Sequence, residues 1–295
     1  MGGTPGVLRR ALRPTLKRLV APIAAVVALL IAARPASVAP GGAEGPIQIF
    51  NGKDLSGFYT WLPSFGREDP DRVFSVVDRI DGAPAIRVSG KHLGGLVTRE
   101  EYANYHLVVE FRWGLATWGE RGNRARDSGV LVHCQSPDGS SDKDSKGPWM
   151  ASVEAQIIEG GTGDIILVRG FDEAGKPVGV RITAAAGKDR DGENVYDPKA
   201  EPREFDGGRV NWSGRDPDWK DELGFRGKND VESLAGEWTR LEVICDGDSV
   251  TNIVNGKVVN AGKRSSLTRG RILLQSELAE IYFRKIELRP LERRG

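Results

Sequence analysis

Short runs in which hydrophobic and polar residues alternate recur along the chain, and turn residues separate them. The clearest run is 105–113, where every second residue is aliphatic or aromatic. Asn255-Gly256 lies between two such runs and predicts a tight hairpin, because a type I′ turn needs positive φ at both central residues. No segment keeps apolar residues at a 3.6-residue period, so helices should be few and short. We therefore predict an all-β fold, a sandwich or jelly roll with two antiparallel sheets and long surface loops.

The run 152–159 carries an unusual polar face. Successive side chains of an extended chain point to opposite faces, so Val153 and Ile157 should face the core while Glu154 and Gln156 share the other face. Strand geometry places these two polar side chains side by side, about 7 Å apart. For this run alone, a solvated sheet face is the ordinary interpretation.

The same residue types recur on three further predicted strands. Glutamate, glutamine, arginine and histidine bind hydroxyl groups and move protons, whereas a solvated face would more often carry lysine, threonine and serine. The positions concerned are Glu110, Arg112, Asp127, His133, Gln275 and Glu277. Together with Glu154 and Gln156 they predict a concave polar groove on one sheet. Such a groove fits a small carbohydrate, since carboxylates and amides bind sugar hydroxyls.

Two long segments interrupt the rhythm of strands. Residues 136–148 are polar and predict a loop, and residues 185–233 predict an insertion loop with spaced aromatic residues, which favour an ordered flap. Trp212 and Trp219 of this insertion either stack on a sugar ring or anchor the loop by burial. We see no linker and no repeat, so residues 44–295 are predicted to form a single domain.

The N-terminal segment has the features of an export signal. Residues 1–39 hold six basic residues and no acidic one, and an apolar run occupies 19–33. That run is short for a membrane span. We interpret residues 1–43 as a signal peptide and N-terminal tail, with cleavage within 33–45. The protein should then be exported, periplasmic or secreted, and should meet a membrane only through this segment.

Charge and cysteine content narrow the choice of function. The formal net charge is +1, but the rest of the chain is acidic once the basic N-terminal segment is set aside, which excludes a nucleic-acid-binding surface. Cys134 and Cys245 lie in strand-like runs and are predicted to be core cysteines rather than a disulfide. With three histidines in all, a structural zinc site is not expected. No cofactor is predicted, and a divalent cation in the groove is left open.

The chain resembles a known family, the 3-keto-disaccharide hydrolase domain family. The matching segments, in order, are 50–57 (FNGKDLSG), 104–107 (NYHL), 110–113 (EFRW), 127–130 (DSGV), 154–157 (EAQI), 236–238 (GEW), 255–256 (NG), 270–277 (GRILLQSE) and 283–286 (FRKI). The resemblance implies a concanavalin A-like jelly-roll β-sandwich exported from bacteria. It also implies cleavage of disaccharides or glycosides that are already oxidised to a ketone at C3.

The chemistry of such a reaction assigns roles to the groove. A C3 ketone acidifies the hydrogen on C2, so a base can remove it, the C1 leaving group departs by elimination, and water then adds. We interpret Glu154 as the base and Gln156 as a group that orients substrate. Arg112 or His133 would stabilise the enolate, and Glu110 or Glu277 would be the acid. Gln275, Asp127, Trp212 and Trp219 would contribute to substrate binding.

Two alternatives from other classes stay open. The pattern Glu154-x-Gln156-x-x-Glu159 is similar to the two-acid strand of sandwich-fold glucanases, although an amide stands where those enzymes have a middle acid. A non-catalytic glycan-binding module would use the same groove without any carboxylate of raised pKa.

Overall fold

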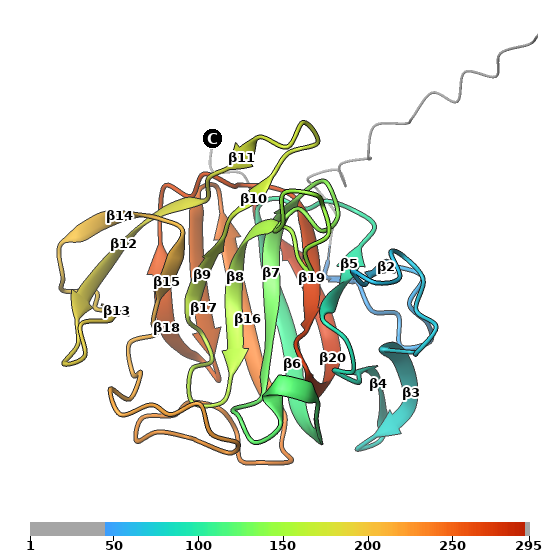
Figure 1. Ribbon diagram of the computed structural model, residues 1–295. Helices are drawn as coiled ribbons and strands as arrows, with labels where there is room; N and C mark the ends of the chain where they lie inside the picture. The colour runs from blue at the N-terminus through green and yellow to red at the C-terminus, as the bar shows by residue number, and fades with distance from the viewer. Residues whose placement is uncertain (1–44, 293–295) are drawn as a thin grey trace, which may run out of the picture. The chain divides into compact units, whose positions relative to one another are not determined.

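Two antiparallel β-sheets lie face to face in residues 45–292, the part of the chain that the computed structural model describes (Figure 1). The signal peptide and tail expected at 1–43 lie outside these residues. Within the described part, the helical structure is a single 3-10 turn, η1 (Gly119–Arg121), and no helix is long and apolar enough to cross a bilayer. The prediction of an all-β fold with few, short helices is confirmed.

The back sheet in Figure 1 contains the longest strand, β6, next to β20 and β16. Its order is β18 (Lys257–Gly262), β17 (Ser249–Val254), β16 (Thr239–Asp246), β6 (Tyr105–Thr117), β20 (Ala279–Pro290), β4 (Ala83–Val88) and β3 (Phe74–Ile80), and β1 (Ile47–Gln48) also pairs with β20.

The front sheet has β7 and β8 at its centre. Its order is β15 (Gly208–Val210), β9 (Ile165–Val168), β8 (Ala151–Ile158), β7 (Asp127–Gln135), β19 (Arg271–Ser276), β5 (Gly94–Thr98) and β2 (Phe58–Trp61). Two small sheets lie beside it: β12 (Arg181–Lys188) with β13 (Asn194–Tyr196) and β14 (Pro202–Asp206), and β10 (Gly170–Phe171) with β11 (Pro177–Val178).

The main core lies between the two sheets. Val153 and Ile157 of β8 and Val109 and Phe111 of β6 are fully buried in it, as the alternation predicts. Burying an aliphatic or aromatic side chain of this size stabilises the fold by about 1.5–3 kcal/mol. The alternation of β8 therefore holds Glu154 and Gln156 on the opposite, outer face of the front sheet. Cys134 and Cys245 are buried free thiols, as predicted.

The segment 185–233 is not one continuous loop, because it contributes β13, β14 and β15 as well as the end of β12. These strands are short, β14 is largely exposed and β13 is half-buried, so the sequence shows no apolar alternation there. The loop that follows is tied to the sandwich. Asp221 accepts hydrogen bonds from Arg124 and from the backbone of Ala125, and the backbone of Gly224 donates to Glu159.

Candidate functional site

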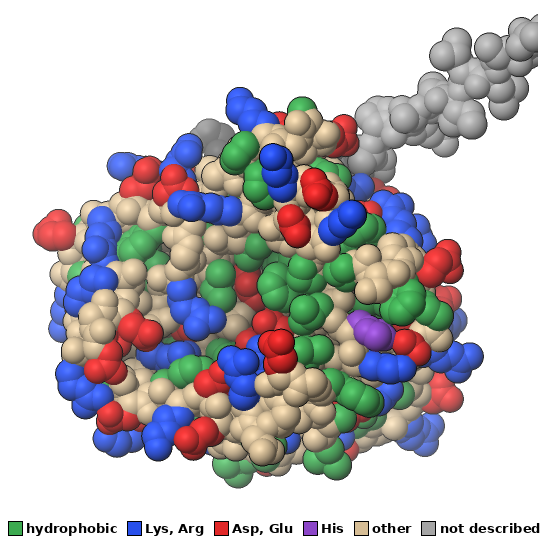
Figure 2. Space-filling model, viewed as in Figure 1, with side chains coloured by type: hydrophobic (Ala, Val, Ile, Leu, Met, Phe, Trp, Pro, Cys, Tyr) green, Lys and Arg blue, Asp and Glu red, His purple; other side chains and the backbone are tan. Residues whose placement is uncertain are grey.

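The outer face of the front sheet carries the polar cluster, and the strand register brings its members together. Gln156 of β8 lies directly opposite Gly129 of β7, and Glu154 lies opposite Leu131. Leu131 in turn pairs with Leu273 of β19, two residues before Gln275. Figure 2 shows this face hollowed near its centre, with acidic side chains at the bottom of the hollow and apolar and basic ones around it.

Gly129 forms the floor of the hollow. A Cβ atom at this position would lie 2.2 Å from Oε1 of Glu154 and 3.1 Å from Oε1 of Gln275. The carboxylate of Glu154 and the amide of Gln275 therefore extend over the bare backbone of β7, and they approach each other because no side chain stands between them.

Three buried oxygen atoms in this cluster have no hydrogen-bond partner among the described residues. They are the Oε1 atoms of Glu154, Gln156 and Gln275. These three residues are 3%, 3% and 1% exposed, respectively. An unsatisfied buried acceptor costs about 1–3 kcal/mol. Three such acceptors in one hollow indicate a site whose hydrogen-bonding capacity is completed by the donors of a ligand.

Glu154 is surrounded by apolar side chains as well. Leu131 and Leu273 belong to a second buried cluster on this outer face, together with Val97, Cys134 and Met150. Burial and, after it, the negative charge of Asp127 raise the pKa of Glu154 to about 8. Glu154 is therefore mostly protonated at pH 7 and becomes a base of unusual strength for a carboxylate when it ionises.

A chain of charged contacts holds the amide of Gln156 in place. Its Nε2 donates to Oδ1 of Asp127 over 2.8 Å, and Arg121 contacts Oδ2 of Asp127 at 2.8 Å and Oε1 of Glu277 at 3.3 Å. This contact turns the amide oxygen of Gln156 away from Asp127 and leaves it free to bind a ligand. Burial raises the pKa of Asp127 to about 6 and that of Glu277 well above its ordinary value, although the charge of Arg121 opposes both shifts.

Five of the predicted site residues thus lie together, and the others do not. Glu110 and Arg112 stand on the outer face of the back sheet, where Arg284 binds Glu110 over 2.8 Å and Arg112 binds Asp81 over 2.9 Å. Their placement in the groove was wrong, because periodicity shows which side chains of a strand share a face but not to which sheet the strand belongs.

His133 is also placed differently from the prediction. A bulge interrupts β7 between Val132 and Gln135, and His133 has φ 56°, so the alternation changes parity there. The ring turns toward Tyr105, with centroids 5.7 Å apart, and its Nδ1 lies 3.0 Å from the carbonyl oxygen of Leu267. Burial lowers the pKa of His133 to about 4, so a neutral ring fills an interior site away from the hollow.

The two tryptophans anchor the insertion, which is one of the two interpretations that the sequence left open. Trp212 is 1% exposed and packs in the main core. Trp219 donates from Nε1 to the carbonyl oxygen of Glu159 over 2.9 Å, and the guanidinium of Arg215 lies 4.1 Å from the centre of its ring. Neither side chain belongs to the cluster around Glu154.

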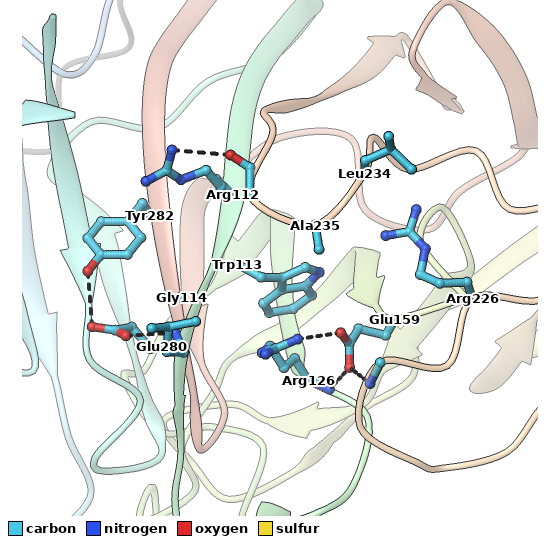
Figure 3. Close-up of a pocket in the computed structure, with 13 residues that line it drawn as sticks. Arg112, Trp113, Gly114, Arg126, Glu159, Arg226, Leu234, Ala235, Glu280 and Tyr282 are labelled. Carbon is cyan, nitrogen blue, oxygen red and sulfur yellow. Dashed lines mark hydrogen bonds and ion pairs between the residues drawn. The ribbon is translucent and has the colours of Figure 1, made fainter. Parts of the chain in front are cut away.

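Glu159, the second acid of the glucanase-like pattern, is bound by Arg126 and Gly224 outside the cluster around Glu154. It accepts from Arg126 Nη1 over 2.6 Å and from the backbone nitrogens of Arg126 and Gly224 over 2.9 Å and 2.8 Å. Glu159 and Arg126 line a separate pocket of about 640 Å³. Figure 3 shows the ring of Trp113 near the centre of this pocket. Glu159 therefore does not face Glu154 as a catalytic partner would.

The site also contains two residues that the sequence analysis did not identify. Arg121 belongs to η1 and Arg209 to the three-residue strand β15, and neither element is long enough to show a periodic pattern. Among residues 45–292, no group of three or more histidine, cysteine, aspartate or glutamate side chains is arranged to hold a metal ion. The expectation that no cofactor is needed stays a prediction.

The arrangement around Gly129 makes a direct prediction about stability. Substituting Gly129→Ala should lower the free energy of unfolding by about 1–3 kcal/mol, because the new methyl group must displace Glu154 or Gln275. Urea denaturation measures this change. Gly187→Ala in β12 is the matched control, since nothing lies within 4 Å of its Cβ position, and it should change stability by less than about 1 kcal/mol. An unchanged Gly129→Ala variant would contradict the position of the Glu154 carboxylate over β7.

A β-sandwich with a polar hollow on one sheet is an architecture that carbohydrate-recognising proteins use repeatedly. The family model of the 3-keto-alpha-glucoside-1,2-lyase-like domain matches residues 45–289. The chain therefore belongs to this family and is a carbohydrate-active protein, and the resemblance noted in the sequence is confirmed. The concanavalin A-like sandwich that this resemblance implied is confirmed with it.

Solved structures with a similar arrangement of strands are distant in sequence. A Parabacteroides distasonis protein with a provisional glycosyl hydrolase assignment is 18% identical, with 84% of this chain and 100% of that chain covered and a TM-score of 0.45. The β-glucanase of Bacillus licheniformis is 11% identical, with 85% and 100% covered and a TM-score of 0.40. The carbohydrate-binding module CBM66 of Bacillus subtilis is 12% identical, with 78% and 93% covered and a TM-score of 0.39. Values this low assign no activity to the chain. Among proteins with curated descriptions, none matches.

Proposed function

We propose that this protein is an exported enzyme that cleaves the glycosidic bond of 3-keto-disaccharides or related 3-keto-glycosides by elimination and hydration. Membership of the family supports this reaction class. The observation that carries the proposal is Glu154, a buried carboxyl group with a pKa of about 8 and a free Oε1 in a hollow lined by unpartnered acceptors. The basic, acid-free N-terminal segment and its apolar run support export to the periplasm or the medium.

Glu154 has the properties that removal of the C2 proton requires. Its Oε1 receives no hydrogen bond from the described residues, so no hydrogen bond to this atom weakens its basicity when it is ionised. With a pKa of about 8, roughly a tenth of the molecules carry the basic form at pH 7. The proton passes from C2 to Glu154, the electron pair forms the enolate of the C3 ketone, and the enolate then expels the oxygen on C1.

Glu277 is suited to protonate the departing oxygen. Burial raises its pKa well above the ordinary value, which favours the protonated form that an acid needs, and Arg121 fixes its position. The products of this step are the free alcohol or sugar and an unsaturated ketone with a double bond between C1 and C2. Addition of water across that bond completes hydrolysis, and the net proton balance restores both carboxyl groups.

The free amide oxygens account for binding of the sugar. Gln156 and Gln275 present acceptors that match the hydroxyl hydrogens of a sugar ring. This acceptor set would also serve a non-catalytic glycan-binding module, which is the second candidate function. The two candidates differ in that binding alone needs no base of raised pKa and no acid opposite it.

Turnover of paired sugars separates these functions. Purified full-length protein incubated with a 3-keto-disaccharide should release the free sugar, whereas the unoxidised parent disaccharide should stay intact, because its C2 hydrogen is not acidic. Chromatography of the products measures both. Cleavage of the parent instead would favour a glucanase-like hydrolase, and binding of either sugar without turnover would favour the binding module.

A further inference from the structure

Arg209 lies in the same row of the front sheet as Glu154. It pairs with Ile166 of β9, and Ile166 pairs with Glu154 of β8. Strands in a sheet are about 4.8 Å apart, so about 10 Å separates the backbones of Arg209 and Glu154. An arginine and a glutamate that extend toward each other on one face can span that distance. Arg209 therefore stands at the edge of the hollow, on the side formed by the insertion.

The guanidinium of Arg209 is incompletely engaged. Its nearest ion-pair contact is Nε to Oδ2 of Asp164 at 3.7 Å, which is beyond hydrogen-bond distance, and its side chain is 35% exposed. Asp164 is bound instead by the backbone nitrogen of Trp212 at 2.7 Å. Among the described residues Arg209 donates no side-chain hydrogen bond, so its donors are available to a ligand.

The guanidinium of Arg121, by contrast, is engaged by protein groups. Arg121 is used by Asp127, Glu277 and the carbonyl oxygen of Ala125, and its side chain is 10% exposed. Arg209 lies close enough to act on the cluster electrostatically. Its positive charge lowers the pKa of Glu154 and of Asp127 and so opposes the effect of burial. Among the described residues, the hollow thus combines several acceptors with the accessible positive donor Arg209 at its edge.

A 3-keto sugar has the complementary set of groups. Its hydroxyls can donate to the oxygens of Gln156 and Gln275, whereas its ketone oxygen can only accept and becomes negative when C2 loses its proton. We propose that Arg209 binds the C3 oxygen of the oxidised sugar and stabilises the enolate formed there. This assignment rests on the proposed function and makes Arg209 a catalytic residue supplied by the insertion.

The consequence is a kinetic effect that appears in the transition state. Loss of a donor to a developing oxyanion typically lowers kcat by about 10²–10³. Substituting Arg209→Ala should have this effect, with a much smaller change in KM, because the negative charge arises only during reaction. The kinetic pKa of Glu154 should rise in the same variant, since a positive charge near it is lost. Added guanidinium ion should restore part of kcat.

The control is Arg203→Ala in β14, an exposed arginine of the same insertion that stacks on Phe205 at 4.8 Å. It should keep the wild-type kcat and show no response to guanidinium. Circular dichroism checks that each variant is folded. If Arg209→Ala does not fold, Arg209→Lys serves as the test variant. It keeps the positive charge but loses the planar pair of donors, so it should still lower kcat.

Each remaining outcome has a distinct meaning. Wild-type kcat in a folded Arg209→Ala variant, or a change in KM alone, would overturn the role of Arg209 and point to the amide nitrogen of Gln275 as the donor. A wild-type protein that binds 3-keto sugars without cleaving them would overturn the proposed function instead. The two failures are therefore distinguishable in one set of assays.

Discussion

Glu154→Gln should lower kcat on a 3-keto-disaccharide by about 10²–10⁴, the usual effect of losing a general base. The substitution keeps the size and hydrogen-bonding capacity of the side chain and removes only its basicity, so KM should change far less. Glu204→Gln on the exposed strand β14 is a matched control, because it makes the same chemical change away from the hollow and should leave kcat unaltered.

The pH dependence tests the same residue in the wild-type protein. Since the base acts in its ionised form, kcat/KM should rise with pH and level off above about 8, the pKa to which burial and Asp127 raise Glu154. The Glu154→Gln variant should lack this rise. Deuterium at C2 of the substrate should slow the wild-type enzyme if proton removal limits the rate. A variant that cleaves the sugar at the wild-type rate would remove Glu154 from the role of base.

Arg121→Met should destabilise the protein by about 3–5 kcal/mol at pH 8, because it leaves Asp127 and Glu277 buried without their shared cation. The loss should be much smaller at pH 5. The pKa of Asp127 in the folded protein, about 6, lies above its ordinary value of 3.8, so its favourable contribution is complete at low pH and is lost as pH rises through about 6. Removing Arg121 moves this pKa further upward.

Urea denaturation at the two pH values measures the difference in the free energy of unfolding. Arg67→Met is the control, since the guanidinium of Arg67 binds Asp138 at 2.7 Å but its side chain is 63% exposed. Exposed ion pairs of this kind contribute about 1 kcal/mol or less. An equal loss of stability at pH 5 and pH 8 in Arg121→Met would show that the charge of Arg121 is not what stabilises the two carboxylates.

Alternation along single strands was enough to find most of the residues in the polar cluster. It placed Glu154 and Gln156 on the outer face of β8, because Val153, Ala155 and Ile157 alternate with them, and it placed Gln275 and Glu277 on one face at the end of β19. The faces could not be assigned to sheets from the sequence, since strand order depends on contacts between distant segments. Glu110 was misplaced for this reason.

Other parts of the site depend on irregular structure. The bulge that turns His133 inward adds a residue to one strand of a pair, and it becomes visible only when both strands are known. Arg121 and Arg209 come from a single helical turn and a three-residue strand, whose positions are set by tertiary packing. Local pattern therefore identified the residues of long strands and missed those of short elements.

The base and the acid of the proposed reaction are held by the framework of the front sheet rather than by its loops. Glu154 lies within β8, and Glu277 directly follows β19, with β7 between these two strands. Their separation is thus governed by the spacing of hydrogen-bonded strands. The loop at 136–148 contributes neither of these side chains, so a change in its length or composition should leave their separation unaltered, whereas the loop at 213–236 supports Arg121 through Asp221. New sugar specificities could therefore be engineered, or could evolve, by loop exchange while the reacting groups keep their geometry.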